Sequence, residues 1–242
     1  MTSRYVSSAI LALVLTSSSI AQEIVTDNAV KEPKAVEIAT ATLERMGGAE
    51  KWDATRYLVW DSFGQRHYWD KWTGDFRWER DSLTVVMNVL TMEGRAWVNG
   101  RAVEAGEDLD GRLADVYGRW VNNMYWLAMP YKLLDPGVNL KYMGEDSTQS
   151  GQMADVLELT FENVGLTPNN RYDVYIDKES GLVCQWSHYR NREDEEPLFT
   201  RPWTDWKEYN GIMLSTGRGG GRQTVTMLDV PDDLPPEIFA GL

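Results

Sequence analysis

Tight turns between short alternating runs are the feature that most constrains this chain. Asn99-Gly100 and Asn210-Gly211 each join two runs in which apolar and polar residues alternate. Asn-Gly is favoured in two-residue hairpin turns because both of its positions need a positive φ. Glycine-containing turns at residues 73–75 and 177–181 join two further pairs of runs. Strands joined in this way pair antiparallel, so the sequence predicts an antiparallel β protein.

Two segments have helical spacing instead. Apolar residues recur every three or four positions over residues 35–46, which Gly47-Gly48 follows, and over residues 107–129, which Pro130 ends. Residues 124–129 are apolar on every side. We therefore expect this end of the longer helix to be buried between layers.

The order of these elements defines the expected fold class. A short helix precedes several strands, and a long helix separates them from many more strands. About ten antiparallel strands in one sheet tend to curl, and an amphipathic helix needs an apolar face to cover. We expect a mostly β, α+β fold: a strongly curved antiparallel sheet or incomplete β-barrel with helices on its concave side.

The N-terminal segment, residues 1–21, has the three parts of a cleavable signal peptide. Arg4 supplies the positive charge, residues 9–15 form a short apolar stretch, and Ser19-Ile20-Ala21 places small residues before a cleavage site. The apolar stretch is shorter than the roughly 20 residues that span a bilayer. We expect a periplasmic or secreted protein with a single domain over residues 22–242 and no transmembrane span.

Charge and the scarcity of metal ligands exclude several function classes. The formal net charge is −13, which argues against nucleic acid as a partner because such partners need a basic patch. Cys184 is the single cysteine, and only two histidines are present, without a zinc-site or redox spacing. We therefore expect no metal, no cofactor and no disulfide, with Cys184 packed as a small hydrophobic side chain.

An excess of aromatic and thioether side chains is the strongest functional signal. The chain has 11 Trp, 11 Tyr and 10 Met. Such residues fill cores, but they also line cavities for apolar ligands, and the sequence leaves both interpretations open. The apolar end of the long helix and the run at residues 83–90 favour a cavity. The expected lining residues are Trp60, Val85, Met87, Trp97, Trp120 and Met124.

Two other functions remain as alternatives to a binding protein for a hydrophobic or acyl ligand. One is a hydrolase that uses a carboxylate pair such as Asp61 and Asp70, since no serine nucleophile elbow is present. The other is an envelope module that binds a protein partner through exposed aromatic residues. The glycine-rich segment 217–222 precedes a strand rather than a helix, so we interpret it as a hairpin tip.

Several longer runs resemble a known type of exported bacterial protein. These are the helix at residues 35–46 with the Gly-Gly pair and Trp52 after it, Met129-Pro130-Tyr131-Lys132-Leu133-Leu134-Asp135-Pro136-Gly137-Val138, and residues 175–183 and 203–212. They resemble the uncharacterised DUF6503 type, which is similar in pattern to the LolA/LolB lipoprotein carriers. The resemblance implies an unclosed β-barrel that holds acyl chains beneath helices, and it carries no catalytic residue over to this chain. The cysteine that anchors LolB-type receptors is absent.

Overall fold

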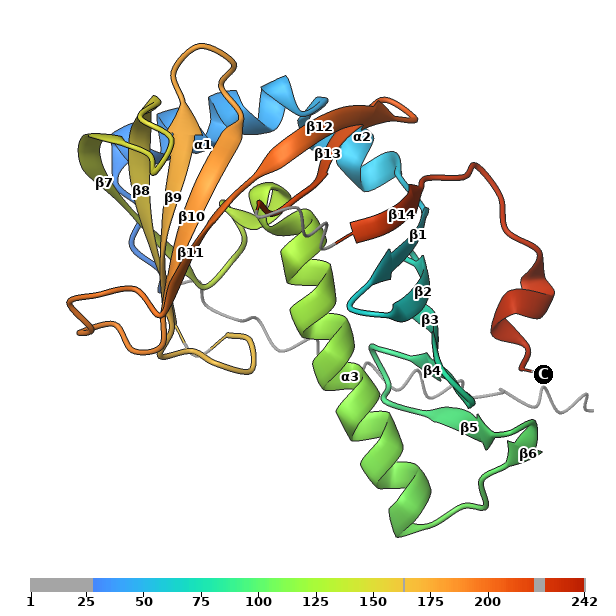
Figure 1. The fold of residues 1–242 in the computed structure, drawn as a ribbon. Helices are drawn as coiled ribbons and strands as arrows, with labels where there is room; N and C mark the ends of the chain where they lie inside the picture. Colours follow the sequence, from blue (N-terminus) through green and yellow to red (C-terminus); the bar gives the residue numbers. More distant parts are fainter. Residues whose placement is uncertain (1–27, 163, 220–224, 242) are drawn as a thin grey trace, which may run out of the picture.

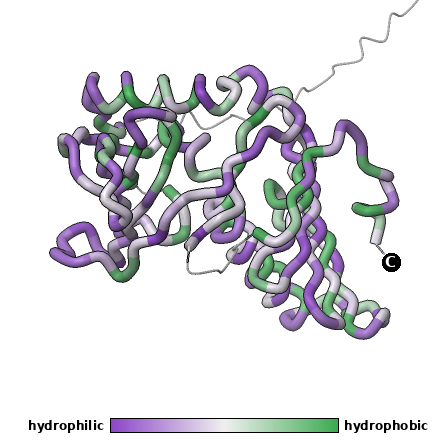
Figure 2. Tube along the Cα trace, turned by 45° about the horizontal axis from the view of Figure 1, so that its top comes forward, coloured by the Kyte–Doolittle hydropathy of each residue, from purple (hydrophilic) through white to green (hydrophobic). Residues whose placement is uncertain are grey.

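The structure is a computed structural model that describes residues 28–162, 164–219 and 225–241. The expected signal peptide and residues 220–222 of the glycine-rich segment lie outside these ranges. Among the described residues, two helices and six strands precede a long helix, and eight strands follow it (Figure 1). Hydrophobic and hydrophilic residues alternate along many of the strands (Figure 2), as expected where one face of a sheet is buried.

The first sheet has seven antiparallel strands. Its order is β14-β1-β2-β3-β4-β5-β6, so the strands follow the chain except for β14, which returns to pair with β1. The bounds are β1 (Tyr57–Ser62), β2 (Gln65–Asp70), β3 (Asp75–Arg80), β4 (Leu83–Asn88), β5 (Gly94–Val98), β6 (Arg101–Ala102) and β14 (Val225–Asp229). The predicted turn at Asn99-Gly100 joins β5 to β6, with both residues at positive φ.

The second sheet has five antiparallel strands in the order β11-β10-β9-β8-β7. The bounds are β7 (Val138–Ser147), β8 (Met153–Phe161), β9 (Arg171–Asp177), β10 (Val183–Tyr189) and β11 (Phe199–Pro202). Helix α1 (Pro33–Arg45) covers one face of this sheet and buries Ala35, Ile38 and Ala39 in its core. Pro33 fixes the φ needed at the first helical position.

A two-stranded hairpin lies beside helix α2 (Gly48–Ala54). Its strands are β12 (Thr204–Tyr209) and β13 (Ile212–Gly217), joined at the predicted Asn210-Gly211 turn. Gly47, which follows α1, has φ +111°, and a Cβ there would lie 2.4 Å from the carbonyl oxygen of Gly211. Glycine at this position therefore allows the α1–α2 turn to approach the hairpin.

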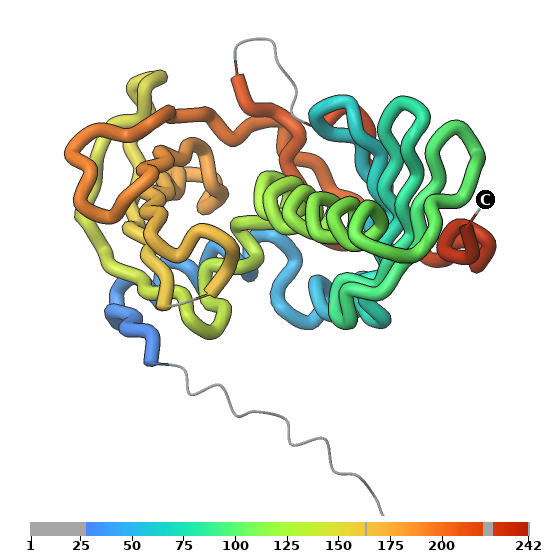
Figure 3. The backbone as a smooth tube through the Cα atoms, turned by 90° about the horizontal axis from the view of Figure 1, so that it is seen from below, coloured from blue at the N-terminus to red at the C-terminus, as the bar shows by residue number. Residues whose placement is uncertain are grey.

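Helix α3 (Glu107–Ala128) lies between the two sheets (Figures 1 and 3). Its residues Leu113 and Val116 join the core of the first sheet, while Tyr125 and Trp126 pack against the core of the second. The 3₁₀ helix η1 (Met129–Lys132), which contains Pro130, follows it directly. Both predicted helices are confirmed, as is the burial of the last turns of the long one between layers.

The mostly β, α+β class is confirmed, but the single continuous sheet is not. The described strands form two sheets and a separate hairpin, and none of these closes into a barrel. The strand ladder is interrupted where the chain leaves β6 through α3 and starts again at β7. The concave placement of helices around one curved sheet stays a prediction.

The C-terminal segment crosses the outer face of the first sheet, on the side opposite α3. It ends in the 3₁₀ helix η2 (Pro236–Phe239). Arg77 donates hydrogen bonds to the carbonyl oxygens of Ile238 at 3.1 Å and Gly241 at 2.8 Å, and Arg95 donates to Ala240 at 2.9 Å. This face is therefore covered by the chain itself.

Candidate functional site

A pocket lined by aromatic rings lies between the C-terminal half of α3 and the second sheet. Its volume is about 400 Å³, and it opens to solvent on one side. Helix α3 contributes Tyr125 and Trp126, and the sheet contributes Phe161, Tyr172 and Trp186. We call this site the aromatic pocket. Most of its surface is apolar, which suits a ligand held by burial rather than by directional bonds.

The rings of the pocket hold one another in place. Tyr172 stacks on Trp186 with centroids 5.0 Å apart, and Trp126 meets Trp186 edge to face at 4.7 Å. The ring of Tyr125 lies 5.5 Å from that of Tyr172. The β9–β10 register explains the first contact, because Val174 pairs with Trp186 and residue 172 is its diagonal neighbour on the same face. The wall is therefore formed before a ligand arrives.

The mouth of the pocket combines a loop and an ion pair. Residues 164–167 line it, and Leu166 is 56 % exposed there. Val164 reaches its position because Gly137 has no side chain: a Cβ on Gly137 would lie 2.5 Å from Cγ1 of Val164. Lys132 and Asp135 also line the pocket and form an ion pair with each other.

Tyr125 supplies a polar atom within this apolar lining. Burial raises the pKa of Tyr125 well above its ordinary value, so the phenol stays neutral at every physiological pH. Its hydroxyl makes no hydrogen bond to any other described residue, although Tyr125 lines the pocket. A ligand with one polar atom on an apolar body could use this hydroxyl as a partner.

Five of the six residues predicted to line a cavity do not lie at this pocket. Trp60, Val85 and Met87 are fully buried in the core between the first sheet and α3, and Trp120 packs at the margin of that core. Met124 belongs to the same core and also lines the aromatic pocket. These residues are thus brought together as neighbours in a packed interior, and their role as ligand contacts stays a prediction.

Trp97, another of the predicted lining residues, lies on the face of the first sheet that is turned away from α3. It pairs with Thr84 on β4, whereas the core residues Val85 and Ala96 pair with each other. The C-terminal segment covers Trp97 on this face, since a Cβ on Gly241 would lie 2.9 Å from the Trp97 ring. The alternation of the strand correctly places Trp97 opposite Ala96, but it cannot say which face is the inner one.

The carboxylates Asp61 and Asp70 do not form a catalytic pair. In the β1–β2 register Asp61 is opposite Arg66 and Asp70 is opposite Tyr57, so they are four positions apart along the hairpin. That spacing corresponds to about 13 Å, beyond the ~5–9.5 Å between paired carboxyl groups of glycosidases. Asp61 accepts two hydrogen bonds from Arg66 at 2.7 Å, and the arginine neutralises it.

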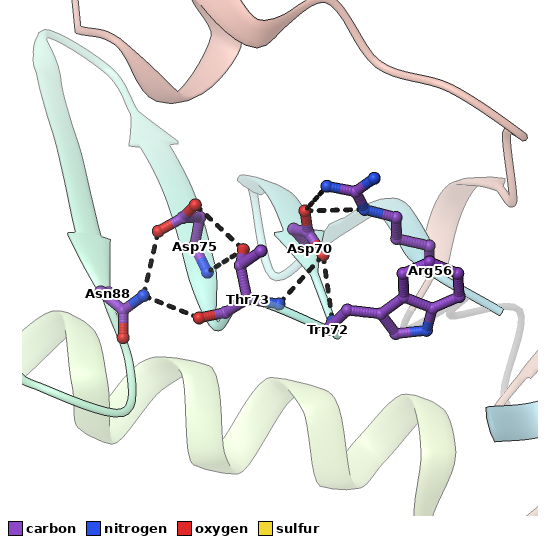
Figure 4. Close-up of polar contacts among 6 residues, drawn as sticks. All are labelled: Arg56, Asp70, Trp72, Thr73, Asp75 and Asn88. Atoms are coloured by element: carbon purple, nitrogen blue, oxygen red, sulfur yellow. Dashed lines mark hydrogen bonds and ion pairs between the residues drawn. The ribbon is translucent and has the colours of Figure 1, made fainter. Parts of the chain in front are cut away.

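Asp70 instead organises a turn. It accepts hydrogen bonds from Arg56 at 2.8 and 3.0 Å and from the backbone amides of Trp72 and Thr73 (Figure 4). Asn88 on β4 donates to the carbonyl of Thr73 at 2.8 Å, which ties this turn to the next hairpin. The cluster is a structural network at one end of the first sheet, and its acids are occupied by partners.

Metal-binding and nucleophilic chemistry find no support in the described chain. No group of three His, Cys, Asp or Glu residues there could hold a metal ion. Burial raises the pKa of the Cys184 thiol to about 11, so this half-buried cysteine stays protonated and unreactive at neutral pH. His67 is fully buried and hydrogen-bonds to the Trp60 carbonyl and to Asn123.

The sequence alone predicts only some of the residues of the aromatic pocket. The predicted burial of residues 124–129 placed Tyr125 and Trp126 correctly between layers. Phe161 and Tyr172 lie on runs whose alternation is visible in the sequence, but their meeting depends on the β8–β9–β10 pairing. Once that pairing is known, Phe161, Tyr172 and Trp186 are seen to share one face of the sheet, and this shared face predicts the site.

Comparisons with known proteins find limited similarity. No family model matches the sequence, and no curated protein does. A solved DUF1329 family protein from Desulfovibrio piger is 14 % identical, with a TM-score of 0.43 over 85 % of this chain and 96 % of that one. The DUF6503 and LolA/LolB resemblance is not among these findings and stays a prediction.

Two further solved structures contain MucB. MucB in complex with MucA is 18 % identical, with a TM-score of 0.25 over 82 % of this chain and 66 % of that chain. The Pseudomonas aeruginosa MucA/MucB complex is 16 % identical, with a TM-score of 0.23 over 64 % of this chain and 52 % of that chain.

Within the described residues, no helix has the length and apolar character needed to cross a bilayer.

Proposed function

We propose that this protein is an exported binding protein that holds one small hydrophobic ligand, or one acyl chain, in the aromatic pocket. The observation that carries the proposal is a pocket of about 400 Å³ walled by five aromatic side chains and open to solvent. Export rests on the signal-like residues 1–21 of the sequence.

The size and lining of the pocket favour a single ligand. Pockets for small molecules occupy about 300–1,000 Å³, so this one is at the small end. Each buried CH₂ group stabilises a complex by about 0.8 kcal/mol, and the apolar walls supply that term without directional bonds. The chemistry needs no nucleophile, metal or acid–base pair, and the carboxylates at Asp61 and Asp70 are too far apart to act together.

A protein partner is the competing proposal. Trp72 is 59 % exposed and Leu90 is 74 % exposed, and they lie on the turns after β2 and β4, at the same end of the first sheet. These are the large apolar side chains that an envelope protein could bury. Changing both to Ser would remove such an interface and leave the aromatic pocket intact.

Binding of N-phenyl-1-naphthylamine, an uncharged aromatic probe, tests the pocket. Val121 lies on α3 and lines the pocket, so Val121→Phe should fill the space and weaken binding at least tenfold. The matched control is Val30→Phe, the same change at a valine that is 70 % exposed, which should bind as the wild type does. Wild-type protein that binds no probe, or Val121→Phe with unchanged affinity and melting temperature, would refute the proposal.

A further inference from the structure

A second hollow lies along α3 beside the aromatic pocket and is lined by different chemistry. Its volume is also about 400 Å³. Its own lining includes Phe63, Gln65 and Arg119, and it shares Gly118 and Asn122 with the aromatic pocket. We call it the polar groove. Because two residues belong to both linings, the two hollows border the same stripe of the helix.

Gly118 lies where the two hollows meet, in the interior of α3. Glycine is a poor helix former, so a glycine inside a helix needs a reason in its surroundings. A Cβ there would meet only Cδ1 of Leu166, at an ordinary contact distance of 3.8 Å. The packing of the protein itself therefore does not require glycine. Its effect is to keep the helix surface between the aromatic pocket and the polar groove free of a side chain.

Arg119 supplies the cation of the polar groove, in an ion pair with Asp115, which also lines this hollow. Its Nε donates to Oδ2 of Asp115 at 2.8 Å, and its guanidinium lies 5.6 Å from the centre of the Trp78 ring. These contacts orient the side chain, and its two terminal nitrogens donate to no other described residue. An oriented guanidinium with free donors matches the geometry of a carboxylate.

The neighbouring side-chain amides also make this end of the site polar. Asn122 donates from Nδ2 to Oδ1 of Asn123, and Asn123 donates to the side chains of Gln65 and His67. This chain fixes the amide of Asn122 at the junction while its own side-chain oxygen stays available. The end of the site near Arg119 is therefore polar, and the end near Trp126 is apolar.

Phe63 connects the two ends from the first sheet. It lines the polar groove and meets the ring of Trp126 edge to face at 5.9 Å. It is also 49 % exposed and has φ +53°, a backbone conformation that bulky residues rarely adopt. Phe63 and Gly64 form the two-residue turn between β1 and β2, which needs positive φ at both positions, so phenylalanine there is costly for the turn itself.

We propose that the aromatic pocket and the polar groove form one bipartite site for a single-chain amphiphile with a carboxylate head, as in a fatty acid. The chain occupies the aromatic pocket, crosses Gly118, and the carboxylate binds the terminal nitrogens of Arg119. A net charge of −13 repels anions at long range, so an acidic ligand needs such a local cation. This inference rests on the proposed binding function and adds the class of ligand.

The test compares laurate with dodecanol, which has the same chain length without the charge. Each displaces N-phenyl-1-naphthylamine from the full mature chain at pH 7.5, and the displacement gives its affinity. Laurate should bind at least tenfold more tightly than dodecanol. Arg119→Gln should remove this preference and leave the affinity for dodecanol unchanged.

A second variant tests the passage. Gly118→Leu places a good helix former at the junction, so it should keep the fold but weaken laurate at least tenfold. Gly111→Leu is the matched control, since Gly111 lies on α3 with nothing within 4 Å of its Cβ position. Circular dichroism and melting temperature confirm that each variant is folded.

The outcomes separate the inference from the function on which it rests. Equal affinities for laurate and dodecanol, both unchanged in Arg119→Gln, would overturn the bipartite site and leave the aromatic pocket standing. Unchanged laurate binding by Gly118→Leu would overturn the passage across the junction. Absence of binding by the probe and by both chain compounds would instead overturn the proposed function.

Discussion

Arg218 donates a 2.6 Å hydrogen bond from Nη2 to the backbone carbonyl of Trp126. Trp126 is in the last turn of α3, where carbonyl groups lack a partner within the helix. A cation at this end also complements the helix dipole. Arg218 is only 2 % exposed, and its guanidinium lies 3.5 Å from the centre of the Trp203 ring. The pair therefore fixes the end of β13 to the helix that carries the aromatic pocket.

Replacing Arg218 with Met should lower the free energy of unfolding by about 3 kcal/mol, because it leaves buried carbonyl groups of Trp126, Ser215 and Gly217 without their donor. Burial lowers the pKa of Arg218 to about 9, which still leaves it charged at pH 7. Urea denaturation of the variant measures the loss. Arg201→Met, at an exposed arginine, is the control and should change stability by less than about 0.5 kcal/mol.

The Arg218 contact also shows where prediction from sequence ends. Local patterns predicted the turns at Asn99-Gly100 and Asn210-Gly211 and the long helix, because each depends on neighbouring residues alone. Residues 217–222 were interpreted as a hairpin tip on the same local grounds, yet Arg218 is buried against a helix about 90 positions earlier. Such a contact depends on long-range packing, which the local composition of a glycine-rich segment does not contain.

The same limit applies to the site. Period-two alternation shows that Trp60 and Trp97 each share a face with particular neighbours, but only the placement of α3 and of the C-terminal segment decides what covers that face. The excess of aromatic residues in the sequence has two structural roles. In the first sheet it fills a core, and between α3 and the second sheet it lines a pocket.

His67 should make the protein less stable as the pH falls below neutral. Burial lowers the pKa of His67 from 6.5 to about 4, so the folded protein binds fewer protons than the unfolded chain between these values. Stability from this residue is complete above pH 6.5 and is lost as the pH falls toward 4, by about 3 kcal/mol in total. Urea denaturation at pH 7.5 and at pH 4.5 measures the difference.

The variant His67→Gln isolates this contribution. Glutamine can accept from Asn123, so the variant should fold, and its stability should change much less between pH 7.5 and pH 4.5. Buried carboxylates with lowered pKa, such as Asp177, titrate below their ordinary value of 3.8 and contribute at lower pH. A pH dependence in His67→Gln as steep as in the wild type would show that another group titrates.

Asp70 and Asp61 should differ in their effect on stability, although both bind an arginine. Burial alone would raise the pKa of Asp70, but the hydrogen bonds from Arg56 and from the amides of Thr73 and Trp72 outweigh it and lower the pKa. Asp70→Asn should cost about 1–2 kcal/mol above pH 4 because a nearly buried acceptor loses its charge. Asp61→Asn, at a more exposed pair, should cost less than about 0.5 kcal/mol.

The same two variants test whether either carboxylate belongs to the binding site. Both should bind N-phenyl-1-naphthylamine with wild-type affinity, since neither carboxylate lines the aromatic pocket or the polar groove. Chemical denaturation and probe titration on the same samples give both results. Equal losses of stability, or weakened binding in either variant, would contradict the structural roles assigned to the two residues.

Phe63→Asn should separate stability from binding. Asn tolerates positive φ better than Phe and, followed by Gly64, would give the favoured Asn-Gly hairpin turn. Relief of the backbone strain should offset the loss of the contact with Trp126, so stability should stay the same or rise by up to about 0.5 kcal/mol. Laurate affinity should nevertheless fall about two- to tenfold, the range expected for one aromatic contact.

Thermal melting together with displacement titration measures both effects of Phe63→Asn. Asp81→Asn is the control, because Asp81 is at another positive-φ turn position, between β3 and β4, and lines neither hollow. It should leave laurate affinity unchanged. If Phe63→Asn lost stability and kept its affinity for laurate, Phe63 would stabilise the packing of the first sheet against α3 and would not contact the ligand.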